Sequence, residues 1–596
     1  MAPESAQAQR AAKLQDLRAA PSVSVLIVGG GINGAGTFRD LALQGVDCLI
    51  VDKGDWCAGT SAAPSRLIHG GLKYLETGEF RLVAESTRER NLLLRNAPHF
   101  VKALPTVVPI RSIFSGIVPA IKRFLGLRAK LADRGLFIVE LGLTLYDWLG
   151  RRHRVMPRHT VALRAATRRH FPAMAPTVLA TSTYYDARIT AAERLCFELV
   201  ADGEAANPRA RALNYLAVTG AVDGCVTLTD QVTGDAVTVE PRFVVNAAGP
   251  WIDRVNGAVG IGKPYIGGTK GSHLVLDNPE LVRQLDGHMV YFGSPDGRIC
   301  LVYPFFGHAL IGSTDIKADN PDAVACDDAE ADYMLAMVRE VFPGLTLMRR
   351  QIVYRYAGIR PLPAVQVDNP GDISRDHSVG RDMLPGSDVP VLSLIGGKWT
   401  TFRALAAEVA NEVLAALRLS RRIETTFVPI GGGRDFPATD DARRAWVDRV
   451  AATYSVTSPR AEALLDRYGT RAEAILKACD GGVDEALRSL PEYSAGELRA
   501  VIASEQVVHL SDIVLRRWPI AVSGRLTRTT ATEIAAHAAP TLLWSDQERE
   551  RQIQNLRNVA LERHGIDIDV APVLSAEPAL IPESRRRELK SRKDGP

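Results

Sequence analysis

Cysteine is scarce in this chain: seven are scattered through 596 residues, with no Cys-x-x-Cys pair and none paired with a nearby histidine. This pattern supplies neither a disulfide framework nor a zinc site, so the sequence predicts no metal centre and favours a reducing, cytoplasmic setting. Long apolar runs are missing too. The best candidate, residues 135–150, is too short to cross a bilayer and contains Glu140 and Asp147. The first twenty residues carry charges throughout and have no apolar core, which argues against a secretory signal.

Charge of one sign is not in large excess either. The formal net charge is +4, and no zinc-finger, RNA-binding or phosphate-loop pattern accompanies it, so nucleic acid is not an expected partner. Apolar residues make up 46% of the chain and charged residues 23%, as in ordinary globular proteins. A chain of 596 residues exceeds what one hydrophobic core usually supports, so we expect two or three domains.

A glycine-rich turn stands near the start of the chain. The apolar run 25–28 opens into Gly29, Gly31 and Gly34, which have the spacing Gly-x-Gly-x-x-Gly. Such a turn lets the following helix present bare N–H groups and its positive end to a pyrophosphate. A second apolar run ends at Asp52, where an acid would bind a ribose hydroxyl. Strand, turn, helix and acid together predict a dinucleotide-binding βαβ unit.

Residues 59–76 indicate which dinucleotide is bound. They are rich in hydroxyls, small residues and cations and poor in apolar side chains, which suits a loop beneath a flat ring and its phosphates. Here the sequence resembles the FAD-dependent glycerol-3-phosphate dehydrogenases, in which a run like that from Ser65 to Glu76 lies along the flavin. This flavin-type loop makes NAD the less favoured dinucleotide.

The resemblance continues in order over most of residues 22–410. A generic flavin fold would share the first motif and the last, but not the whole ordered series. We therefore identify the chain as a member of this family. The further matching motifs are Glu79-Phe80-Arg81-Leu82-Val83, Asn96-Ala97-Pro98-His99, 244–251, Lys270-Gly271-Ser272-His273, Ile311-Gly312-Ser313-Thr314-Asp315, 356–362, Ile373-Ser374-Arg375-Asp376 and 396–403.

The resemblance implies an α/β fold class: a Rossmann-like FAD-binding domain with an antiparallel-sheet substrate cap, of the glutathione-reductase and D-amino-acid-oxidase type, plus a C-terminal α-helical domain. Local signals agree with it. Apolar runs at 243–247 and 391–395 lead into glycine turns, and 272–276 and 299–303 alternate as antiparallel strands do. Ser458-Pro459 and the capping box Ser494-x-x-Glu497 are typical helix starts.

The domain boundaries follow from these signals. We expect an N-terminal tail at 1–21, an oxidoreductase core at 22–417, a helical domain at 418–566 and a basic tail at 567–596. Within the core, the FAD-binding segments are about 22–100, 185–260 and 388–417, and the cap segments are about 101–184 and 261–387.

The residues expected to bind FAD come from the glycine turn, the acid, the flavin loop and two later turns. They are Gly29, Gly31, Asn33, Gly34, Asp52, Thr60, Ser61, Ser65, Arg66, Leu67, His69, Gly70, Gly71, Ala248, Gly249, Trp251, Gly397, Lys398, Thr400 and Thr401.

Oxidation of a secondary alcohol by flavin needs a C–H bond directed at flavin N5 and an acceptor for the hydroxyl proton. It also needs cations to bind any anionic group of the substrate. With their motifs matched, Arg360 and Arg375 are expected to bind a phosphate in bidentate fashion. Lys398 would stabilise negative charge on the reduced flavin or the alkoxide. Two histidines, His69 and His273, are candidate proton acceptors.

Of these two, His69 is the first choice for a role near N5, because it shares the flavin loop with Lys73. Lys73, His273, Arg360 and Lys398 complete the catalytic set. Tyr74 and Thr314 are expected to position the substrate. The catalytic residues are His69, Lys73, His273, Arg360 and Lys398, and the substrate-binding residues are Lys73, Tyr74, Thr314, Arg360 and Arg375.

Three positions depart from the family pattern. Lys73 stands where arginine is common, and its compact ammonium is not equivalent to a planar fork. Arg66 replaces a usual lysine, which keeps the local cation count, and Phe402 lacks the hydroxyl of the usual tyrosine. These changes leave the FAD prediction intact. They make related polyol phosphates, such as erythritol phosphate, alternative substrates.

The resemblance implies oxidation of sn-glycerol 3-phosphate to dihydroxyacetone phosphate, with electrons passed to membrane quinone. A basic amphipathic stretch at 111–134, with Lys122, Arg123, Arg128 and Lys130, suits peripheral contact with the inner face of the cytoplasmic membrane. Packing on the domain is the alternative for this stretch. Alternatives for the whole protein are an oxygen-reducing oxidase and a non-catalytic flavin sensor, and a homodimer is compatible with the sequence.

Overall fold

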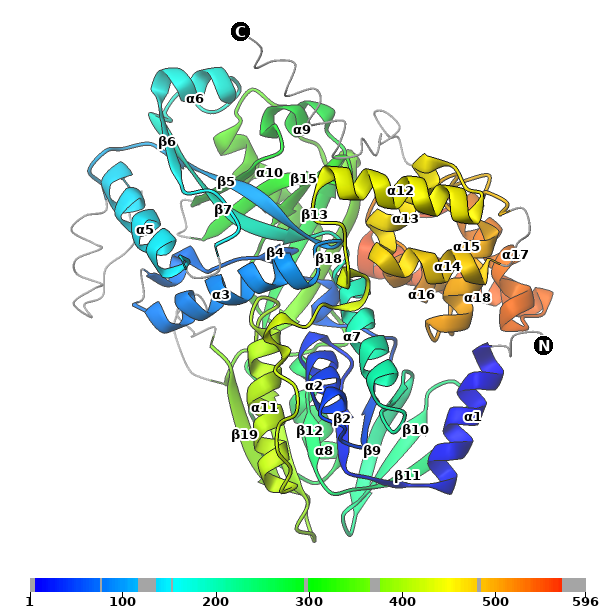
Figure 1. Ribbon diagram of the computed structural model, residues 1–596. Helices are drawn as coiled ribbons and strands as arrows, with labels where there is room; N and C mark the ends of the chain where they lie inside the picture. The colour runs from blue at the N-terminus through cyan, green and yellow to red at the C-terminus, as the bar shows by residue number, and fades with distance from the viewer. Residues whose placement is uncertain are drawn as a thin grey trace.

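A mostly parallel six-stranded sheet forms the lower part of the molecule in Figure 1, and the glycine turn follows one of its central strands. The computed structural model describes residues 6–75, 78–115, 135–151, 154–293, 298–364, 376–479 and 484–570. The strand order is β19 (Ser378–Met383), β20 (Pro390–Ile395), β12 (Val244–Asn246), β2 (Val25–Val28), β3 (Cys48–Val51) and β8 (Arg211–Leu213). Only the β19–β20 pair is antiparallel.

Both faces of this sheet are covered, which is why its central strands are continuous apolar runs. Alternate residues point to opposite faces. Val25 and Ile27 of β2 belong to one core with the helices α2 (Ile32–Leu43), α7 (Ala192–Ala206) and α11 (Phe402–Ala416). Leu26 and Val28 belong to a second core on the other face.

A second sheet supplies that other core together with helix α8 (Ile252–Ala258). It has four strands in the order β1 (Ser22–Val23), β11 (Ala236–Pro241), β10 (Cys225–Asp230) and β9 (Leu216–Val222). Helix α8 packs between β9 and the strands β12 and β20. The six-stranded sheet therefore lies between a helical layer and this smaller sheet.

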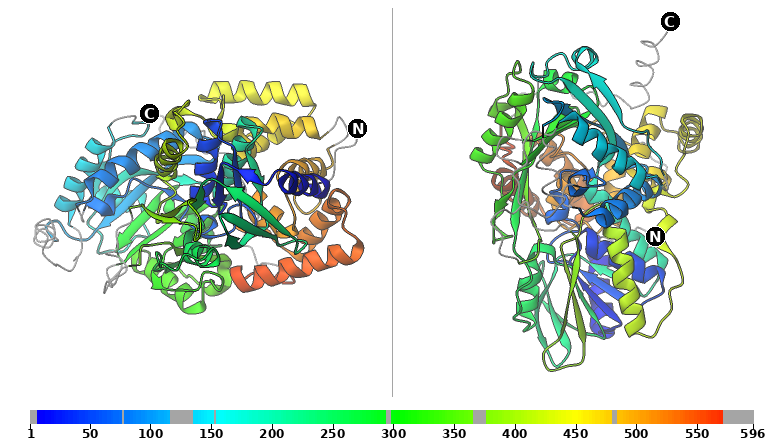
Figure 2. Two further views of the ribbon diagram at one scale, coloured as in Figure 1. Left: turned by 90° about the horizontal axis from the view of Figure 1, so that it is seen from below. Right: turned by 90° about the vertical axis from the view of Figure 1, so that its left-hand side faces the viewer.

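The cap is a ten-stranded, largely antiparallel sheet that lies above the first domain (Figure 2, right). Its main order is β17 (Ile316–Lys317), β13 (Thr269–Leu276), β16 (His308–Gly312), β15 (Ile299–Phe305), β14 (Met289–Gly293), β5 (Val101–Ile110), β7 (Ala180–Ile189) and β4 (Leu67–Ile68). Strand β18 (Ile352–Arg360) pairs with β13, and β6 (Thr160–Leu163) pairs with β7.

Helices cover the cap from several sides. Helices α9 (Pro279–Leu285) and α10 (Asp328–Val341) pack on one face and form a core with β13 to β16. Helices α3 (Phe80–Asn96), α5 (Leu136–Leu149) and α6 (Arg164–His170) lie toward the β5–β7 end (Figure 1).

The helical domain predicted after residue 420 is present and packs beside the cap (Figure 1). Its helices are α12 (Asp440–Tyr454), α13 (Ser458–Tyr468), α14 (Ala472–Ala478), α15 (Ala495–Ser504), α16 (Leu510–Asp512), α17 (Arg528–Leu542) and α18 (Asp546–His564). As the sequence predicts, Ser494 caps α15 by accepting the N–H of Glu497. The core of this domain includes cap residues such as Tyr303 and Tyr356.

The structure changes the expected boundaries in three places. Residues 6–19 of the predicted N-terminal tail form helix α1 (Ala6–Ala19), which buries Leu14 and Leu17 against the second sheet. Strand β19, placed in the cap from sequence, extends the FAD-binding sheet, because its backbone pairs with β20. Strands β4 and the end of β7, placed in FAD-binding segments, belong to the cap sheet.

The predicted membrane-binding stretch and the predicted basic tail lie mostly outside the described residues. Most of the basic stretch 111–134, including all four cations named in it, lies outside them, as does the tail from residue 571. Among the described residues, no helix is long and apolar enough to span a bilayer.

Candidate functional site

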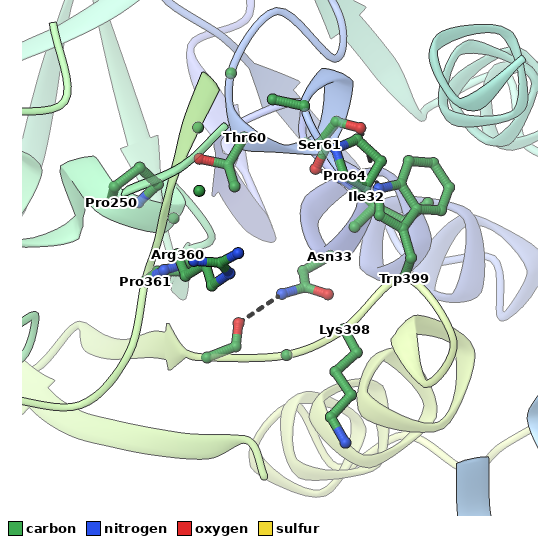
Figure 3. Close-up of a pocket in the computed structure, with 18 of the residues that line it drawn as sticks. Ile32, Asn33, Thr60, Ser61, Pro64, Pro250, Arg360, Pro361, Lys398 and Trp399 are labelled. Atoms are coloured by element: carbon green, nitrogen blue, oxygen red, sulfur yellow. Dashed lines mark hydrogen bonds between the residues drawn. The ribbon is translucent and has the colours of Figure 1, made fainter. Parts of the chain in front are cut away.

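A cavity of about 1250 Å³ opens at the carboxyl ends of β2, β12 and β20 and continues beneath the cap sheet. The ends of parallel strands are where α/β sheets bind ligands. Typical small-molecule pockets occupy about 300 to 1,000 Å³, so this cavity has room for a dinucleotide together with a small substrate. Figure 3 shows Asn33, Thr60, Ser61, Arg360 and Lys398 around it.

The glycine turn has the geometry that a pyrophosphate requires. Gly29 has φ +109°, and a Cβ there would lie 2.6 Å from the carbonyl oxygen of Ala247. A Cβ at Gly34 would lie 1.9 Å from the oxygen of Gly29, so this glycine serves close packing and does not line the cavity. Helix α2 starts after Gly31, which provides no side-chain cap, and its first turn faces the cavity. The turn therefore fits the phosphates of FAD.

Asp52 lies at the end of β3 and lines the cavity, as the ribose-binding acid would. Its Oδ2 accepts the N–H of Gly30 at 2.6 Å, and its Oδ1 accepts that of Gly54 at 2.8 Å. Burial raises the pKa of Asp52 to about 6, against the lowering effect of these two bonds. Each carboxylate oxygen has a further lone pair with which it could accept from a ribose hydroxyl.

The flavin loop is fixed to both domains. Thr60 donates to the carbonyl of Ile359 at 2.6 Å. The backbone N–H and C=O of His69 both bond the hydroxyl of Thr400 at 3.2 Å. The N–H of Gly70, which does not line the cavity, donates to the Tyr146 hydroxyl and to Asp186, each at 3.0 Å. This anchoring leaves Ser65, Leu67, His69 and Gly71 along the cavity wall.

Arg66 is not part of this wall, contrary to the prediction from sequence. Its guanidinium is fully buried and forms a bidentate pair with Glu193 of α7, with distances of 2.5 and 3.0 Å. The residue therefore stabilises the junction of loop and helix and adds no cation to the cavity. Both Thr400 and Thr401 are buried at the turn before α11, but Thr400 lines the cavity and Thr401 does not.

Predicted catalytic cations meet in the cavity. Lys73 and Tyr74 come from the flavin loop, Lys398 from the turn after β20 and Arg360 from β18. The Lys398 ammonium lies 3.9 Å from the centre of the Tyr74 ring. Arg360 donates to Asp315 at 2.9 Å and to Ser313 at 3.2 Å, which fixes its guanidinium plane.

Thr314 lines the cavity, but its hydroxyl is committed to the protein. It donates to the buried Glu330 at 2.7 Å and accepts the N–H of Ser272 at 2.9 Å. These bonds fix the turn that carries Ser313 and Asp315. Arg375, the second predicted phosphate ligand, lies outside the described residues.

His273 is held as a neutral imidazole. It is buried, stacks on Tyr356 at 4.9 Å and bonds the Ser65 hydroxyl through Nε2 at 2.8 Å. Burial, followed by the charges of Arg360 and Arg66, lowers its pKa to about 3. Its Nδ1 is buried with no hydrogen-bond partner among the described residues.

Several residues of the cavity wall are not predicted from the sequence. The cap contributes Met289, Tyr291 and Arg298, and the helical domain contributes Arg563 of α18. No local motif marks these positions, because only the tertiary fold brings β14, β15 and α18 to the cavity. An isolated arginine in a charged helix such as α18 gives no sequence signal.

Comparisons with known proteins cover nearly the whole chain. The FAD-dependent oxidoreductase family matches residues 24–410, and the family described as the C-terminal domain of alpha-glycerophosphate oxidase matches residues 423–549. A glycerol-3-phosphate dehydrogenase of Synechocystis sp. is 33% identical over 560 residues, which cover 89% of this chain and 95% of the relative. A D-erythritol 1-phosphate dehydrogenase of Brucella abortus is 31% identical over 514 residues, 83% of this chain and 93% of that protein.

A solved structure has the same fold. The glycerol-3-phosphate dehydrogenase of Bacillus halodurans complexed with FAD superposes with a TM-score of 0.71 at 23% identity, covering 96% of this chain and 100% of that one. The predicted α/β core with a helical C-terminal domain is thereby confirmed.

Proposed function

Because the chain belongs to the FAD-dependent glycerol-3-phosphate dehydrogenase family, we propose that it oxidises sn-glycerol 3-phosphate to dihydroxyacetone phosphate. FAD, when bound, supplies the acceptor for the hydride that leaves C2 of the alcohol. One observation carries the proposal: Lys73, His273, Arg360 and Lys398 line the same cavity as the dinucleotide turn.

Arg360 is assigned to the phosphate. Asp315 and Ser313 orient its guanidinium, and a planar fork with further N–H groups suits a phosphate oxygen pair. Arg375 is proposed as a second phosphate ligand, on the family motif alone. With the substrate phosphate bound by Arg360 and Arg375, the C2 hydroxyl would lie in the remaining part of the cavity.

Proton transfer is assigned to His273. As hydride leaves C2, the hydroxyl proton must leave as well, and a neutral imidazole can accept it. Burial is the main cause of the low pKa of His273, and the positive charge of Arg360 lowers this pKa further. A bound phosphate offsets the charge of Arg360, which makes the imidazole a stronger base when substrate is present. Lys398, which lines the same cavity, would stabilise the developing alkoxide. His69, the first choice from sequence, is the competing acceptor.

A four-carbon polyol phosphate is the second candidate substrate. Lys73 departs from the family arginine, and a D-erythritol 1-phosphate dehydrogenase is among the relatives. Steady-state rates with a soluble dye test the choice. We expect kcat/KM to be highest for glycerol 3-phosphate and far lower for free glycerol. Preference for an erythritol phosphate would replace the substrate, and equal rates with free glycerol would remove the phosphate cations from the proposal.

We propose membrane quinone as the electron acceptor, reached by peripheral association with the inner face of the cytoplasmic membrane. Support comes from α5, whose buried face carries Val139, Leu143 and Tyr146. Its opposite face exposes Phe137, Leu141 and Trp148 by 56%, 60% and 55%. Exposed apolar rows of this kind suit an interfacial helix. Oxygen is the competing acceptor, and accumulation of hydrogen peroxide in place of quinol would select it.

A further inference from the structure

The helical domain places two arginines against the loop next to Asp52, at the end of the cavity where the adenosine half of FAD is expected. Arg516 and Arg517 end the π-helical turn η9 (Ile513–Arg517) and both bind Asp55. Arg517 does so in a bidentate pair with distances of 2.7 and 2.9 Å. Asp55 and Arg517 are 1% exposed each, so the pair is closed to solvent.

Asp55 belongs to a loop wedged against the glycine turn. Trp56 is fully buried and lies so close to Gly30 that a Cβ there would stand 2.3 Å from its ring. The N–H of Cys57 donates to the carbonyl of Gly30 at 3.0 Å. Loop 52–58 is therefore fixed between the dinucleotide turn on one side and Arg517 on the other.

A second connection reaches the start of β9. Tyr215 donates to Asp512 of α16 at 2.6 Å, and Asn214 donates to Asp55 at 3.0 Å and to the carbonyl of Gln506 at 2.9 Å. Directly afterwards, the N–H of Leu216 donates to the carbonyl of Asp52 at 2.7 Å. Leu216 and the two residues after it line the cavity.

The two arginines keep Asp55 ionised despite its burial. Burial alone would raise the pKa of Asp55, but Arg517 and Arg516 hold it well below its ordinary value. A buried ion pair with several satisfied hydrogen bonds fixes geometry, since any other arrangement leaves a charge unpaired. Arg563 of the same domain also lines the cavity, near Lys53.

We propose that Arg516 and Arg517 are positioning residues for FAD. Through Asp55 they hold loop 52–58 and the start of β9 in the shape that receives the adenosine half of the cofactor, so the helical domain is part of the FAD site. The proposal rests on FAD binding and not on the identity of the substrate.

The test is the affinity of the full-length protein for FAD. Arg517→Lys keeps the charge but loses the fork, so the variant should fold and bind FAD about tenfold more weakly. Arg467→Lys is the matched control, because Arg467 binds the buried Glu497 within the helical domain and does not line the cavity. Release of FAD from the diluted holoenzyme, followed by flavin fluorescence, gives the dissociation constant without any substrate.

Faster FAD release in Arg517→Lys than in Arg467→Lys, at comparable melting temperatures, is the expected result. Equal effects in both variants would mean a general loss of stability and would overturn the proposal, as would unchanged affinity. Tyr215→Phe, which removes only the bond to Asp512, serves if Arg517→Lys does not fold, and it too must weaken FAD binding. When saturated with FAD, each variant should keep the KM of the parent enzyme.

Discussion

Arg360 lies flat over Gly271, where a Cβ would stand 2.2 Å from its Nη2. This close approach, together with Asp315, leaves one orientation for the guanidinium. Arg360→Lys should therefore raise the KM for glycerol 3-phosphate about 10- to 100-fold, because a bidentate charge-assisted pair is lost at about 1.5–3 kcal/mol. FAD content should stay unchanged. The control is Arg349→Lys, because Arg349 is exposed and paired with Asp332. An unaltered KM in Arg360→Lys would exclude Arg360 from the phosphate site.

His273 makes the fold sensitive to acid. Its pKa is about 3 when folded and 6.5 when unfolded, so the unfolded chain binds the proton more tightly. The stability that the neutral imidazole contributes is complete above pH 6.5 and is lost as the pH falls from 6.5 toward 3. At pH 4 this loss amounts to about 3 kcal/mol. Melting temperatures from pH 7 to pH 4 should fall less steeply in His273→Gln; parallel curves for both proteins would contradict this linkage.

Sequence predicts best those residues whose role is local. Gly29, Asp52 and Lys398 stand in short motifs at strand ends, and the structure brings them to one cavity. Arg66 shows the opposite case. It stands in the flavin-loop motif, but its partner Glu193 lies 127 positions away in sequence, so only the fold reveals that Arg66 forms a buried ion pair and does not line the cavity.

Helix α5 has one buried and one exposed apolar face, and substitutions on the exposed face test its role in membrane binding. Phe137→Ser with Trp148→Ser should lower binding to anionic liposomes at least tenfold, since each large apolar side chain contributes about 1.5–3 kcal/mol on burial. Activity with a soluble dye should persist, because the cavity is untouched. Leu543→Ser, at an exposed leucine of the helical domain, is the control. Undiminished liposome binding by the double variant would remove α5 from the membrane proposal.

Strand and helix starts follow from sequence wherever the signal is local. The glycine turn gives α2, and the capping box gives α15 with Ser494 as its cap. Membership of a sheet does not follow in this way. Its position in the chain predicts β19 in the cap, but its hydrogen bonds to β20 place it in the six-stranded sheet. Helix α1 has only two buried residues, too few to reveal its packing in advance.

At the scale of the molecule, the core of the helical domain is shared with the cap. Trp446, Leu464 and Trp518 belong to one core with Tyr303 and Phe305 of β15. A chain that ends at residue 417 should therefore expose a large apolar surface and fail to retain FAD. Size-exclusion chromatography and the flavin-to-protein absorbance ratio are the measurements. A monodisperse, fully yellow fragment would show that the core domain folds and binds FAD alone.

We propose that FAD and a polyol phosphate share the cavity between the six-stranded sheet and the cap sheet. Anaerobic mixing of the purified holoenzyme with glycerol 3-phosphate, followed at the oxidised flavin band, tests it in one trace. Rapid bleaching of the flavin is the predicted result. A spectrum that stays oxidised with glycerol 3-phosphate, and then with four-carbon polyol phosphates, would exclude both substrates and favour a flavin-binding protein without turnover.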